Sequence, residues 1–261
     1  MSEELLIEDK ARLKKVSSIL VSQPKPTGDK SPYFDLAEKF NIKIDFRPFI
    51  QIDPVDIKEF RAQKIDILKH SAVIFTSRNA VDHFFRLAAE SKVEIPSDMK
   101  YFCISEQTAN YLQKYIVIRK RKIFTGSRTA TELIEVLKKH KNEKYIFPCS
   151  NIRKNDIPDF LSENGFDCTE AIIYKTVASD LSDLADVNYD VIAFFSPSGI
   201  NSLMVNFPDF EQKKTRIAAF GPTTAKAVRD ADLILDIQAP LPNAPSMTGA
   251  LEYYIKKANN I

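Results

Sequence analysis

Glycine is scarce in this sequence, and its scarcity argues against the common nucleotide-binding motifs. Only six of the 261 residues are glycine. None of them has the GxGxxG spacing that lets a backbone approach a dinucleotide pyrophosphate, and no Walker loop occurs. A nucleotide-dependent enzyme on a Rossmann-like or flavodoxin-like sheet is therefore disfavoured.

Cysteine and histidine are also few, with three residues of each. The cysteines lie in strand-like contexts without the close spacing of metal or redox motifs, and the histidines lie far apart in helical contexts. We interpret the cysteines as reduced core residues, which fits a reducing cytoplasm, and the histidines as surface or capping residues. These residues are Cys103, Cys149, Cys168, His70, His83 and His140. We therefore expect no metal site and no Ser-His-Asp triad.

Neither a long apolar run nor a strong net charge is present. No segment approaches the roughly 18 apolar residues of a membrane span, and the charged start of the chain (Glu3, Glu4) is unlike a secretory signal. The formal net charge of +2 is too small to hold nucleic acid over the whole surface. We interpret the densest basic cluster, Lys114 with residues 119–122, as a solvated loop. A cytoplasmic protein is expected, and a monomer because no exposed apolar stripe or heptad pattern occurs.

The chain repeats itself once, at an offset of nearly half its length. In each copy an apolar run is followed by small hydroxyl residues and then by an apolar pattern of helical period. The matching segments are FTSRNAV (75–81) with FSPSGIN (195–201), ISEQTANYL (104–112) with FGPTTAKAV (220–228), and TATELIEVL (129–137) with SMTGALEYY (246–254). A repeat of whole supersecondary units predicts two similar domains, with a ligand in the cleft between them.

Short β-branched or aromatic runs alternate with amphipathic stretches, which predicts α/β domains with parallel sheets. Strands are expected near Ser18–Ser22, Ala72–Phe75, Tyr101–Ile104, Lys144–Phe147, Val191–Phe195, Arg216–Phe220 and Leu233–Ile237. Helices are expected to begin near Asn79, Glu106, Thr129, Lys154, Gly199, Pro222 and Met247.

Two extended segments interrupt this alternation, Asp45–Ile52 and Glu170–Val177, and we interpret them as linker strands. The first domain would then comprise residues 1–46 and 176–261, the second residues 52–170, and the linker residues 47–51 and 171–175. A tandem division near Glu143 fits the repeat equally well. Leu20–Pro24 and Ile146–Ser150 would then open the two halves.

Hydroxyl and amide side chains follow the predicted strands, where ligands of open α/β sheets bind. Helices begin at the same places, and their free N–H groups favour carboxylates or phosphates. Each residue taken alone is also a good helix N-cap, but the repetition in both halves favours a ligand site. The candidates are Thr76, Ser77, Ser105, Thr108, Ser150, Asn151, Ser196, Ser198, Thr223 and Thr224. Tyr174 in the second linker segment is a candidate proton donor, or alternatively a packed linker tyrosine.

In order and spacing these motifs resemble the uroporphyrinogen-III synthase family over nearly the whole chain. The matching segments are ILVSQP (19–24), VIFTSRNAV (73–81), the long signature at 147–177, DVIAFFSPSGI (190–200), AAFGPTTAKAV (218–228) and APSMTGALEYYI (244–255). The resemblance implies two flavodoxin-like domains joined by a two-stranded linker. It also implies the cyclisation of hydroxymethylbilane to uroporphyrinogen III, with loss of water and inversion of ring D and without a metal or organic cofactor.

The resemblance assigns roles to individual residues as well. By its place in the YKT signature Tyr174 resembles the family tyrosine suspected of proton donation, and Thr76, Thr108, Ser150, Ser196 and Thr224 match family cleft positions. The chain departs from the family at Gln23, where arginine is frequent, and at Ser105, where glycine is common. Arg153 or Lys25 is expected to supply the missing positive charge. The rival interpretation is a non-catalytic two-domain binder of a small polycarboxylate or other anion.

Overall fold

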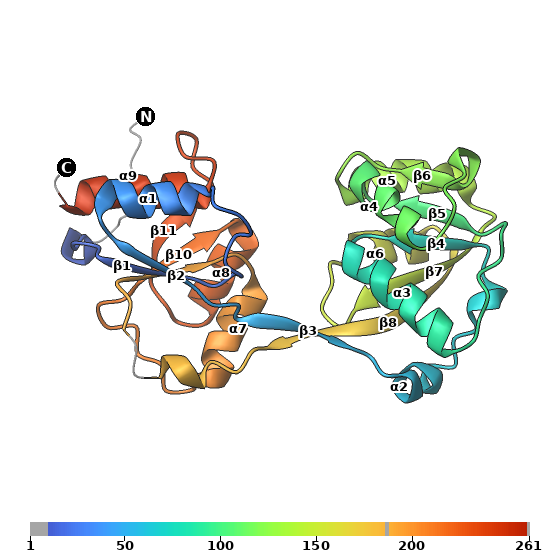
Figure 1. The fold of residues 1–261 in the computed structure, drawn as a ribbon, viewed down its shortest axis with the longest axis horizontal. Coiled ribbons are helices and arrows are strands. Elements are labelled where there is room, and N and C mark those ends of the chain that lie inside the picture. Colours follow the sequence, from blue (N-terminus) through green and yellow to red (C-terminus); the bar gives the residue numbers. More distant parts are fainter. Residues whose placement is uncertain (1–9, 186–187, 260–261) are drawn as a thin grey trace. The chain divides into compact units, whose positions relative to one another are not determined.

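The computed structural model describes residues 10–185 and 188–259, and these form two compact units (Figure 1). Unit 1 contains the described residues up to Gln51 and from Val177 onward, and unit 2 contains Ile52–Thr176. Residues 1–9 of the expected first domain, including Glu3 and Glu4, lie outside the described residues, as do 186–187 and 260–261.

Unit 1 is a five-stranded sheet with helices on both faces. Its strand order is β11-β10-β9-β1-β2, and every neighbouring pair is parallel. The strands are β1 (Ser18–Val21), β2 (Lys43–Phe46), β9 (Val191–Phe194), β10 (Arg216–Phe220) and β11 (Leu235–Ala239). The helices are α1 (Pro32–Phe40), α7 (Pro197–Asn206), α8 (Pro222–Asp230) and α9 (Met247–Asn259), with 3-10 turns η1 (Lys10–Arg12) and η6 (Ser182–Leu184). Leu36 of α1 and Leu251 of α9 share one core, and Leu203 of α7 and Val228 of α8 share another.

Unit 2 is a six-stranded sheet of order β3-β8-β7-β4-β5-β6. The strands are β3 (Ile50–Pro54), β4 (Ala72–Phe75), β5 (Lys100–Cys103), β6 (Ile123–Thr125), β7 (Lys144–Ser150) and β8 (Asp167–Ala178). The helices are α2 (Ile57–Ala62), α3 (Arg78–Glu90), α4 (Glu106–Tyr111), α5 (Ala130–Leu137) and α6 (Asp156–Glu163), with 3-10 turns η2 (Ile67–Lys69), η3 (Leu112–Lys114), η4 (Lys120–Lys122) and η5 (Lys138–His140). The strands from β8 to β6 are all parallel to their neighbours.

The two sheets have the same spatial order of strands but begin at different points along the chain. Unit 1 follows the flavodoxin-like order 2-1-3-4-5, read from β2 to β11. Read from β8 to β6, the sheet of unit 2 has the same spatial order of strands. The first of these five strands along the chain, however, is β4, which occupies the third position in the sheet. The three repeated sequence segments therefore fall on matching elements: β4-α3 with β9-α7, β5-α4 with β10-α8, and β6-α5 with β11-α9. The predicted class, α/β with parallel sheets, is confirmed.

The predicted elements differ from the observed ones in a few places. All seven predicted strands occur, but β11 begins at Leu235, because the Leu233 N–H bonds the Val228 carbonyl and so closes the end of α8. The segment Asp45–Ile52 is not one extended strand. It contains the end of β2 and the start of β3, separated by a break at Pro48, which has no N–H to donate to a ladder. Helices α1 and α2 and strand β6 were not predicted.

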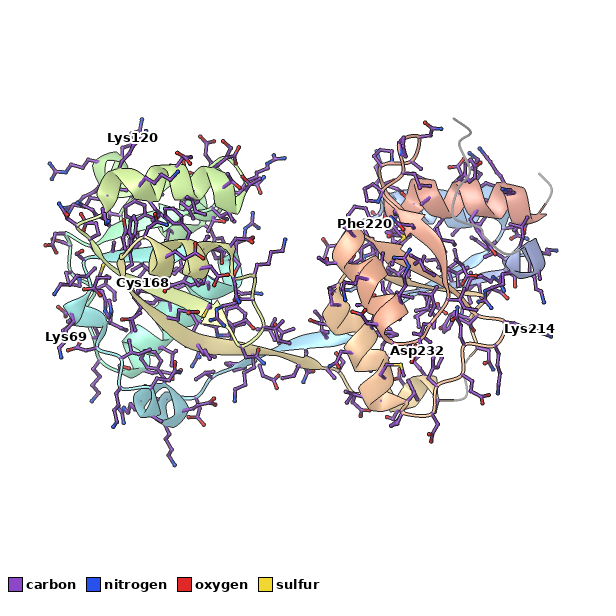
Figure 2. All side chains as sticks on the ribbon, turned by 180° about the vertical axis from the view of Figure 1, so that it is seen from behind. Lys69, Lys120, Cys168, Lys214, Phe220 and Asp232 are labelled. Carbon is purple, nitrogen blue, oxygen red and sulfur yellow. The ribbon has the colours of Figure 1, made fainter. Side chains whose placement is uncertain are left out.

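The three cysteines are free thiols in unit 2. Cys103 and Cys149 are buried, and Cys168 on β8 is half-buried (Figure 2). Burial raises the pKa of Cys103 to about 12 and that of Cys149 to about 11. These thiols are therefore protonated at neutral pH and poorly nucleophilic.

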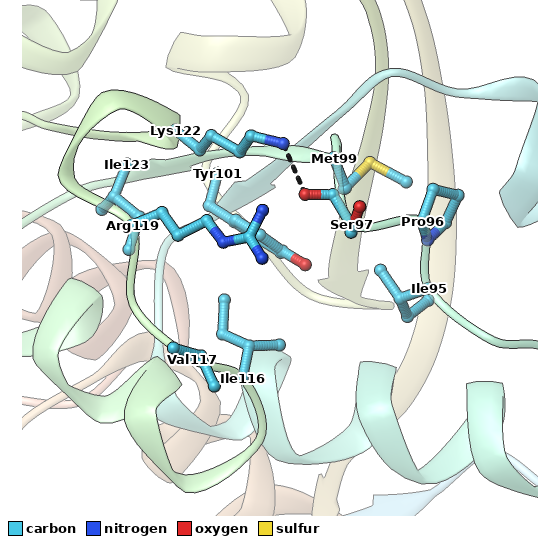
Figure 3. A pocket seen from close by; sticks show the side chains of 10 residues that line it. All are labelled: Ile95, Pro96, Ser97, Met99, Tyr101, Ile116, Val117, Arg119, Lys122 and Ile123. Carbon is cyan, nitrogen blue, oxygen red and sulfur yellow. Dashed lines mark hydrogen bonds between the residues drawn. The ribbon is translucent and has the colours of Figure 1, made fainter.

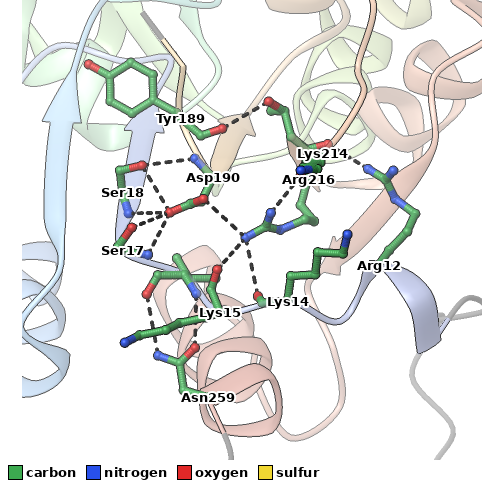
Figure 4. A network of polar contacts seen from close by, with 12 residues as sticks. Arg12, Lys14, Lys15, Ser17, Ser18, Tyr189, Asp190, Lys214, Arg216 and Asn259 are labelled. Atoms are coloured by element: carbon green, nitrogen blue, oxygen red, sulfur yellow. Dashed lines mark hydrogen bonds and ion pairs between the residues drawn. The ribbon is translucent and has the colours of Figure 1, made fainter.

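A buried arginine fixes the start of unit 1 to its sheet. The Arg216 side chain is nearly sealed from solvent, and its guanidinium donates to the carbonyls of Lys14, Lys15 and Lys214 (Figure 4). The carboxylate of Asp190 lies 3.8 Å from the guanidinium and accepts the Ser17 N–H. Because a buried cation needs such partners, this network holds the segment before β1 against the amino ends of β9 and β10.

Candidate functional site

An open cavity lies at the carboxyl ends of β4 and β7 in unit 2. Its volume is about 510 Å³. Four of the candidate site residues line it, namely Thr76, Ser150, Arg153 and Tyr174. The cavity therefore brings these four of the unit 2 candidates together at the strand ends, where ligands of an open parallel sheet bind.

Tyr174 is held in this cavity by contacts on two sides. Its side chain is 8% exposed, and its hydroxyl oxygen lies 3.3 Å from that of Ser77. The ring stacks on the imidazole of His83, with 5.3 Å between the ring centroids. Burial raises the pKa of Tyr174, and the Ser77 contact opposes this only in part. The phenol is thus protonated at neutral pH and available as a hydrogen-bond donor.

Ser77 has a second role at the start of α3. It is the N-cap residue, and its side-chain oxygen accepts the N–H of Ala80 at 3.0 Å. A hydroxyl oxygen that accepts from a helix can still donate its own hydrogen. Ser77 does not line the cavity itself, so its effect on a ligand there passes through Tyr174.

Ser150 and Asn151 form a polar cluster at the end of β7. The Ser150 hydroxyl donates to the Asn151 side-chain oxygen at 2.9 Å and lies 3.0 Å from the Thr176 hydroxyl on β8. The Asn151 oxygen also accepts the Thr176 N–H at 2.8 Å. The Ser150 oxygen also accepts the Ile152 N–H at 3.3 Å. Because its hydrogen and its oxygen are both engaged, Ser150 can bond a ligand only after exchanging partners.

Two cations without an ion-pair partner also line the cavity. Arg153 forms an ion pair with Glu170, but Arg128 and Lys154 form none with any residue in 10–185 and 188–259. Asp156 is the one carboxylate among the lining residues. The cavity therefore carries surplus positive charge and suits an anionic ligand.

The N-terminus of α5, which borders the cavity, is already occupied by a carboxylate of its own. Glu132 accepts the backbone N–H groups of Arg128 and Thr129 at 2.8 and 3.0 Å, which completes a capping box and lowers the pKa of Glu132. The positive end of this helix is thus partly neutralised. Side-chain cations are therefore the stronger anion-binding groups in this part of the cavity.

The other unit 2 candidates differ in how much their hydroxyls are engaged. The Thr76 hydroxyl is half-buried, and it makes no hydrogen bond with any residue that the structure describes. Thr108 is buried, and its hydroxyl lies 3.2 Å from that of Ser105, the N-cap of α4. Thr76 can therefore reach a ligand directly, whereas Thr108 lies away from the cavity lining.

The unit 1 candidates lie on the first turns of α7 and α8. Ser196 caps α7, and its side-chain oxygen accepts the Gly199 N–H at 3.3 Å. Ser198 is half-buried, Thr223 is exposed and Thr224 is buried. These helices follow β9 and β10, so the four residues lie at the carboxyl edge of the unit 1 sheet.

Sequence reasoning missed several residues near the cavity. Arg128 and Lys154 line it, and His83 packs on the candidate proton donor instead of facing solvent. The RTATE pattern at 128–132 is a capping-box signal that marked the start of α5, but nothing in it shows that Arg128 faces β7. Gln23 is exposed and Lys25 lies over the Phe34 ring, both in unit 1.

Among residues 10–185 and 188–259, no group of three or more His, Cys, Asp or Glu side chains is arranged to hold a metal ion. In the same residues, no helix combines the length and apolarity needed to cross a bilayer.

The chain is a two-unit α/β protein, and the cavity beyond the strand ends of unit 2 is lined by three cations and one carboxylate. Comparison with known families is more specific. The family model described as uroporphyrinogen-III synthase HemD matches residues 32–249, which is most of the chain. The chain therefore belongs to the uroporphyrinogen-III synthase family.

Individual relatives agree with this assignment. The chain is 26% identical over 208 residues to the uroporphyrinogen-III synthase of Saccharomyces cerevisiae, covering 70% of this chain and 75% of the relative. The solved uroporphyrinogen-III synthetase of Helicobacter pylori is similar with a TM-score of 0.58 at 18% identity, covering 92% of this chain and 99% of that one. A mutant uroporphyrinogen III synthase of Thermus thermophilus gives 0.56 at 14% identity, with the same coverage. Because these sequence identities are so low, the two structures support the assignment of the fold and nothing further.

Proposed function

We propose that this chain converts hydroxymethylbilane to uroporphyrinogen III in tetrapyrrole biosynthesis. The proposal rests on the family match over residues 32–249. The surplus positive charge of the unit 2 cavity is consistent with a substrate that carries carboxylates. The family match favours this activity over a non-catalytic polycarboxylate binder. In the reaction the ring A hydroxyl leaves as water, ring D is inverted through a spiro intermediate, and the macrocycle closes.

The main task of the protein is to impose a geometry on a reactive substrate. The linear bilane cyclises unaided to the wrong isomer, so holding its ends in the productive arrangement is worth more than a strong acid or base. Its eight carboxylates need donors. In unit 2 these are Arg128, Lys154 and the hydroxyl of Thr76, with Arg153 available if Glu170 releases it.

Donors in unit 1 complete the proposed binding set. Ser196, Ser198, Thr223 and Thr224 lie at the helix starts beyond β9 and β10, where backbone N–H groups also point outward. We assign Ser77, Thr108, Ser150 and Asn151 to binding or to holding the site in shape. Each unit is thereby proposed to supply donors for carboxylates of the substrate.

Tyr174 is the proposed proton donor for water loss. Its phenol is protonated at neutral pH, lines the cavity and is oriented by Ser77. Donation of a hydrogen bond or proton to the ring A hydroxyl lets that oxygen depart as water. A phenol with a raised pKa is a weak acid, so its contribution is smaller than that of substrate positioning.

We propose that the enzyme uses no metal or organic cofactor, acts as a monomer in the cytoplasm, and binds neither nucleic acid nor membrane in order to function. Hydroxymethylbilane is its only proposed reactant.

The direct test is product analysis. Purified protein is incubated with freshly generated hydroxymethylbilane, and the oxidised porphyrins are separated by chromatography. A predominance of the type III isomer is expected, whereas type I at the level of the enzyme-free reaction would exclude the activity.

A further inference from the structure

A second concave site lies in unit 2, and it shares no residue with the cavity of Tyr174. It is a pocket of about 220 Å³ between the segment 95–101 and the segment 116–123. Its walls are mostly aliphatic, with Ile95, Pro96, Met99, Ile116 and Ile123 among the lining residues (Figure 3).

Two polar groups in this pocket lack partners. Tyr101 is 5% exposed and lines the pocket, yet its hydroxyl makes no hydrogen bond with any residue in the described ranges. Arg119 points into the pocket alongside the Tyr101 ring, and it forms no ion pair with a described residue (Figure 3). Arg119 is exposed, and the Tyr101 hydroxyl faces the open pocket, so both groups can contact a ligand there without first releasing a side-chain partner among the described residues.

The surface around the pocket is both apolar and strongly basic. Val117 is 85% exposed, and the neighbouring Ile118 is exposed as well. Lys120 and Arg121 follow, and neither forms an ion pair within the described part of the chain; Figure 2 shows Lys120 extending outward from the unit. Lys122 of this run does have a partner, because its ammonium donates to the Ser97 carbonyl at the rim. Among the described residues, no carboxylate lines the pocket.

We propose that this pocket is a docking site for an acidic peptide segment of a partner protein, with one apolar side chain of the peptide inserted. The volume suits a single large side chain, since a cavity of roughly 150 Å³ already accepts benzene. Arg119 would pair with a peptide carboxylate, and the Tyr101 hydroxyl with a peptide carbonyl or carboxylate. Lys120 and Arg121 would attract the rest of the acidic segment.

The shape and lining of the site favour a peptide over the other polyanions. An anionic bilayer presents a broad flat surface and cannot fill a narrow pocket, and the hydroxyl of Tyr101 would stay unpaired. Single-stranded nucleic acid binds through exposed aromatic faces that stack on bases, whereas this pocket exposes aliphatic walls. An acidic segment with one apolar side chain would pair with the cations, hydrogen-bond the Tyr101 hydroxyl and pack against the aliphatic walls.

The test is a binding titration with a designed probe. A fluorescein-labelled octapeptide of seven glutamates with one central leucine is titrated with the full chain, and polarisation is read at low and high salt. The same peptide with serine in place of leucine is the matched probe. We expect the leucine peptide to bind at least tenfold more tightly than the serine peptide, and its binding to weaken as salt rises.

Substitutions test whether the leucine peptide binds in the pocket. We expect Arg119→Gln to weaken binding about tenfold or more, because a hydrogen bond to a charged group is lost. Tyr101→Phe is expected to weaken it severalfold. Lys138→Gln, which removes one exposed charge from η5 in the same unit, should change it less than twofold.

Several results would overturn the proposal: equal affinity for the two peptides, no effect of Arg119→Gln, an equal effect of Lys138→Gln, or tighter binding of anionic phospholipid vesicles or of a single-stranded oligonucleotide. Synthase activity of Arg119→Gln is measured in parallel and should equal that of the wild type. Since the two assays are independent, failure of the docking site is distinguishable from failure of the synthase reaction.

Discussion

The hydroxyl oxygens of Tyr174 and Ser77 lie 3.3 Å apart, which joins β8 to the first turn of α3. The same serine oxygen caps the helix, so the geometry of the proposed proton donor depends on the helix start. His83 on the next turn of α3 stacks on the tyrosine ring. One helix therefore positions the phenol from two directions.

Removal of the Tyr174 hydroxyl is expected to slow turnover and to leave the fold intact. We predict that Tyr174→Phe lowers kcat about tenfold or more while KM changes little, because the lost contact acts on the leaving hydroxyl. The measurement is the initial rate of type III product formation under conditions where spontaneous cyclisation is subtracted.

Tyr145→Phe provides the matched control. Tyr145 is a buried tyrosine on β7 whose hydroxyl donates to the His140 carbonyl, so this variant also loses one hydroxyl from the same sheet. Its kcat should be close to that of the wild type. If the two variants had equal rates, the Tyr174 hydroxyl would have no role in the chemistry.

Substitution of the two serine N-caps of unit 2, Ser77 and Ser105, distinguishes an effect on stability from an effect on activity. Ser77→Ala and Ser105→Ala each remove an N-cap hydrogen bond, and each is expected to lower the free energy of unfolding by about 1 kcal/mol. Only Ser77 contacts Tyr174, so only Ser77→Ala should lower kcat. Urea unfolding and initial rates on both variants check this, and a parallel loss of rate in Ser105→Ala would show that the effect is general.

Three neighbouring cations of the cavity should differ in their effect on substrate affinity. Arg128 and Lys154 have no ion-pair partner among the described residues, whereas Arg153 is paired with Glu170. We therefore predict that Arg128→Gln and Lys154→Gln each raise KM severalfold and that Arg153→Gln raises it less. Salt should raise the KM of the wild type as well, because carboxylate capture is partly electrostatic. A KM independent of salt, or a largest effect at Arg153, would contradict the assignment.

The sequence predicted the sheet architecture well because its signals are local. The motif VIFTSRNAV (73–81) shows an apolar run, a cap and the first apolar helix positions within nine residues, and the structure places the end of β4, Ser77 and the start of α3 there. The repeat then predicted the matching elements of unit 1. Element α1 was missed although Ser31 caps it and Pro32 opens it, because it lies outside the repeated segments and follows a stretch with Pro24, Pro26 and Gly28 that is typical of a loop.

The composition of the cavity could not be predicted in the same way. Arg128, Lys154 and His83 are exposed or helical positions by local pattern, and their roles depend on which strand end each one faces. Likewise, no local rule shows that Glu170 pairs with Arg153, since those residues lie on β8 and after β7 and meet only when the strands pair. Such contacts are set by the register of the sheet.

Histidine protonation should destabilise unit 2 as the pH falls. Burial and the nearby Arg86 lower the pKa of His83 in the folded state below its ordinary value of 6.5. As the pH falls, His83 therefore takes up a proton at a higher pH in the unfolded chain than in the folded chain. The contribution of neutral His83 to the unfolding free energy is complete above the pKa of the unfolded state, and it is lost as the pH falls from that value toward the pKa of the folded state. We predict that the unfolding free energy declines as the pH falls below the ordinary histidine pKa of 6.5, and that this decline is shallower in His83→Gln.

The readout for this prediction is the slope of stability against pH, because His83→Gln also removes the stacking on Tyr174. Burial lowers the pKa of His140 too, so His140→Gln should flatten the slope independently. An unchanged slope in the double variant would show that these imidazoles do not govern the decline.

Substitution of Arg216 tests whether the two units unfold independently. Replacement by methionine removes the cation that holds three backbone carbonyls before β1 and β10, and it leaves Asp190 with only its serine partners. Loss of one member of a buried ion pair costs about 3 kcal/mol or more, and we predict the lower end of this range because Asp190 is partly exposed. Arg229→Met, at an exposed position on α8, should cost less than about 0.5 kcal/mol.

Native-state hydrogen exchange resolves where this stability is lost. In Arg216→Met, amides of β1, β9 and β10 should lose protection, since the segment before β1 is no longer tied to the sheet. Amides of β4, β5 and β7 should keep theirs, because the cores of unit 2 contain none of the residues of this network. Equal loss of protection in both sheets would mean that the two units unfold as one cooperative structure, and the stability effects of substitutions in either unit would then have to be assigned to the whole chain.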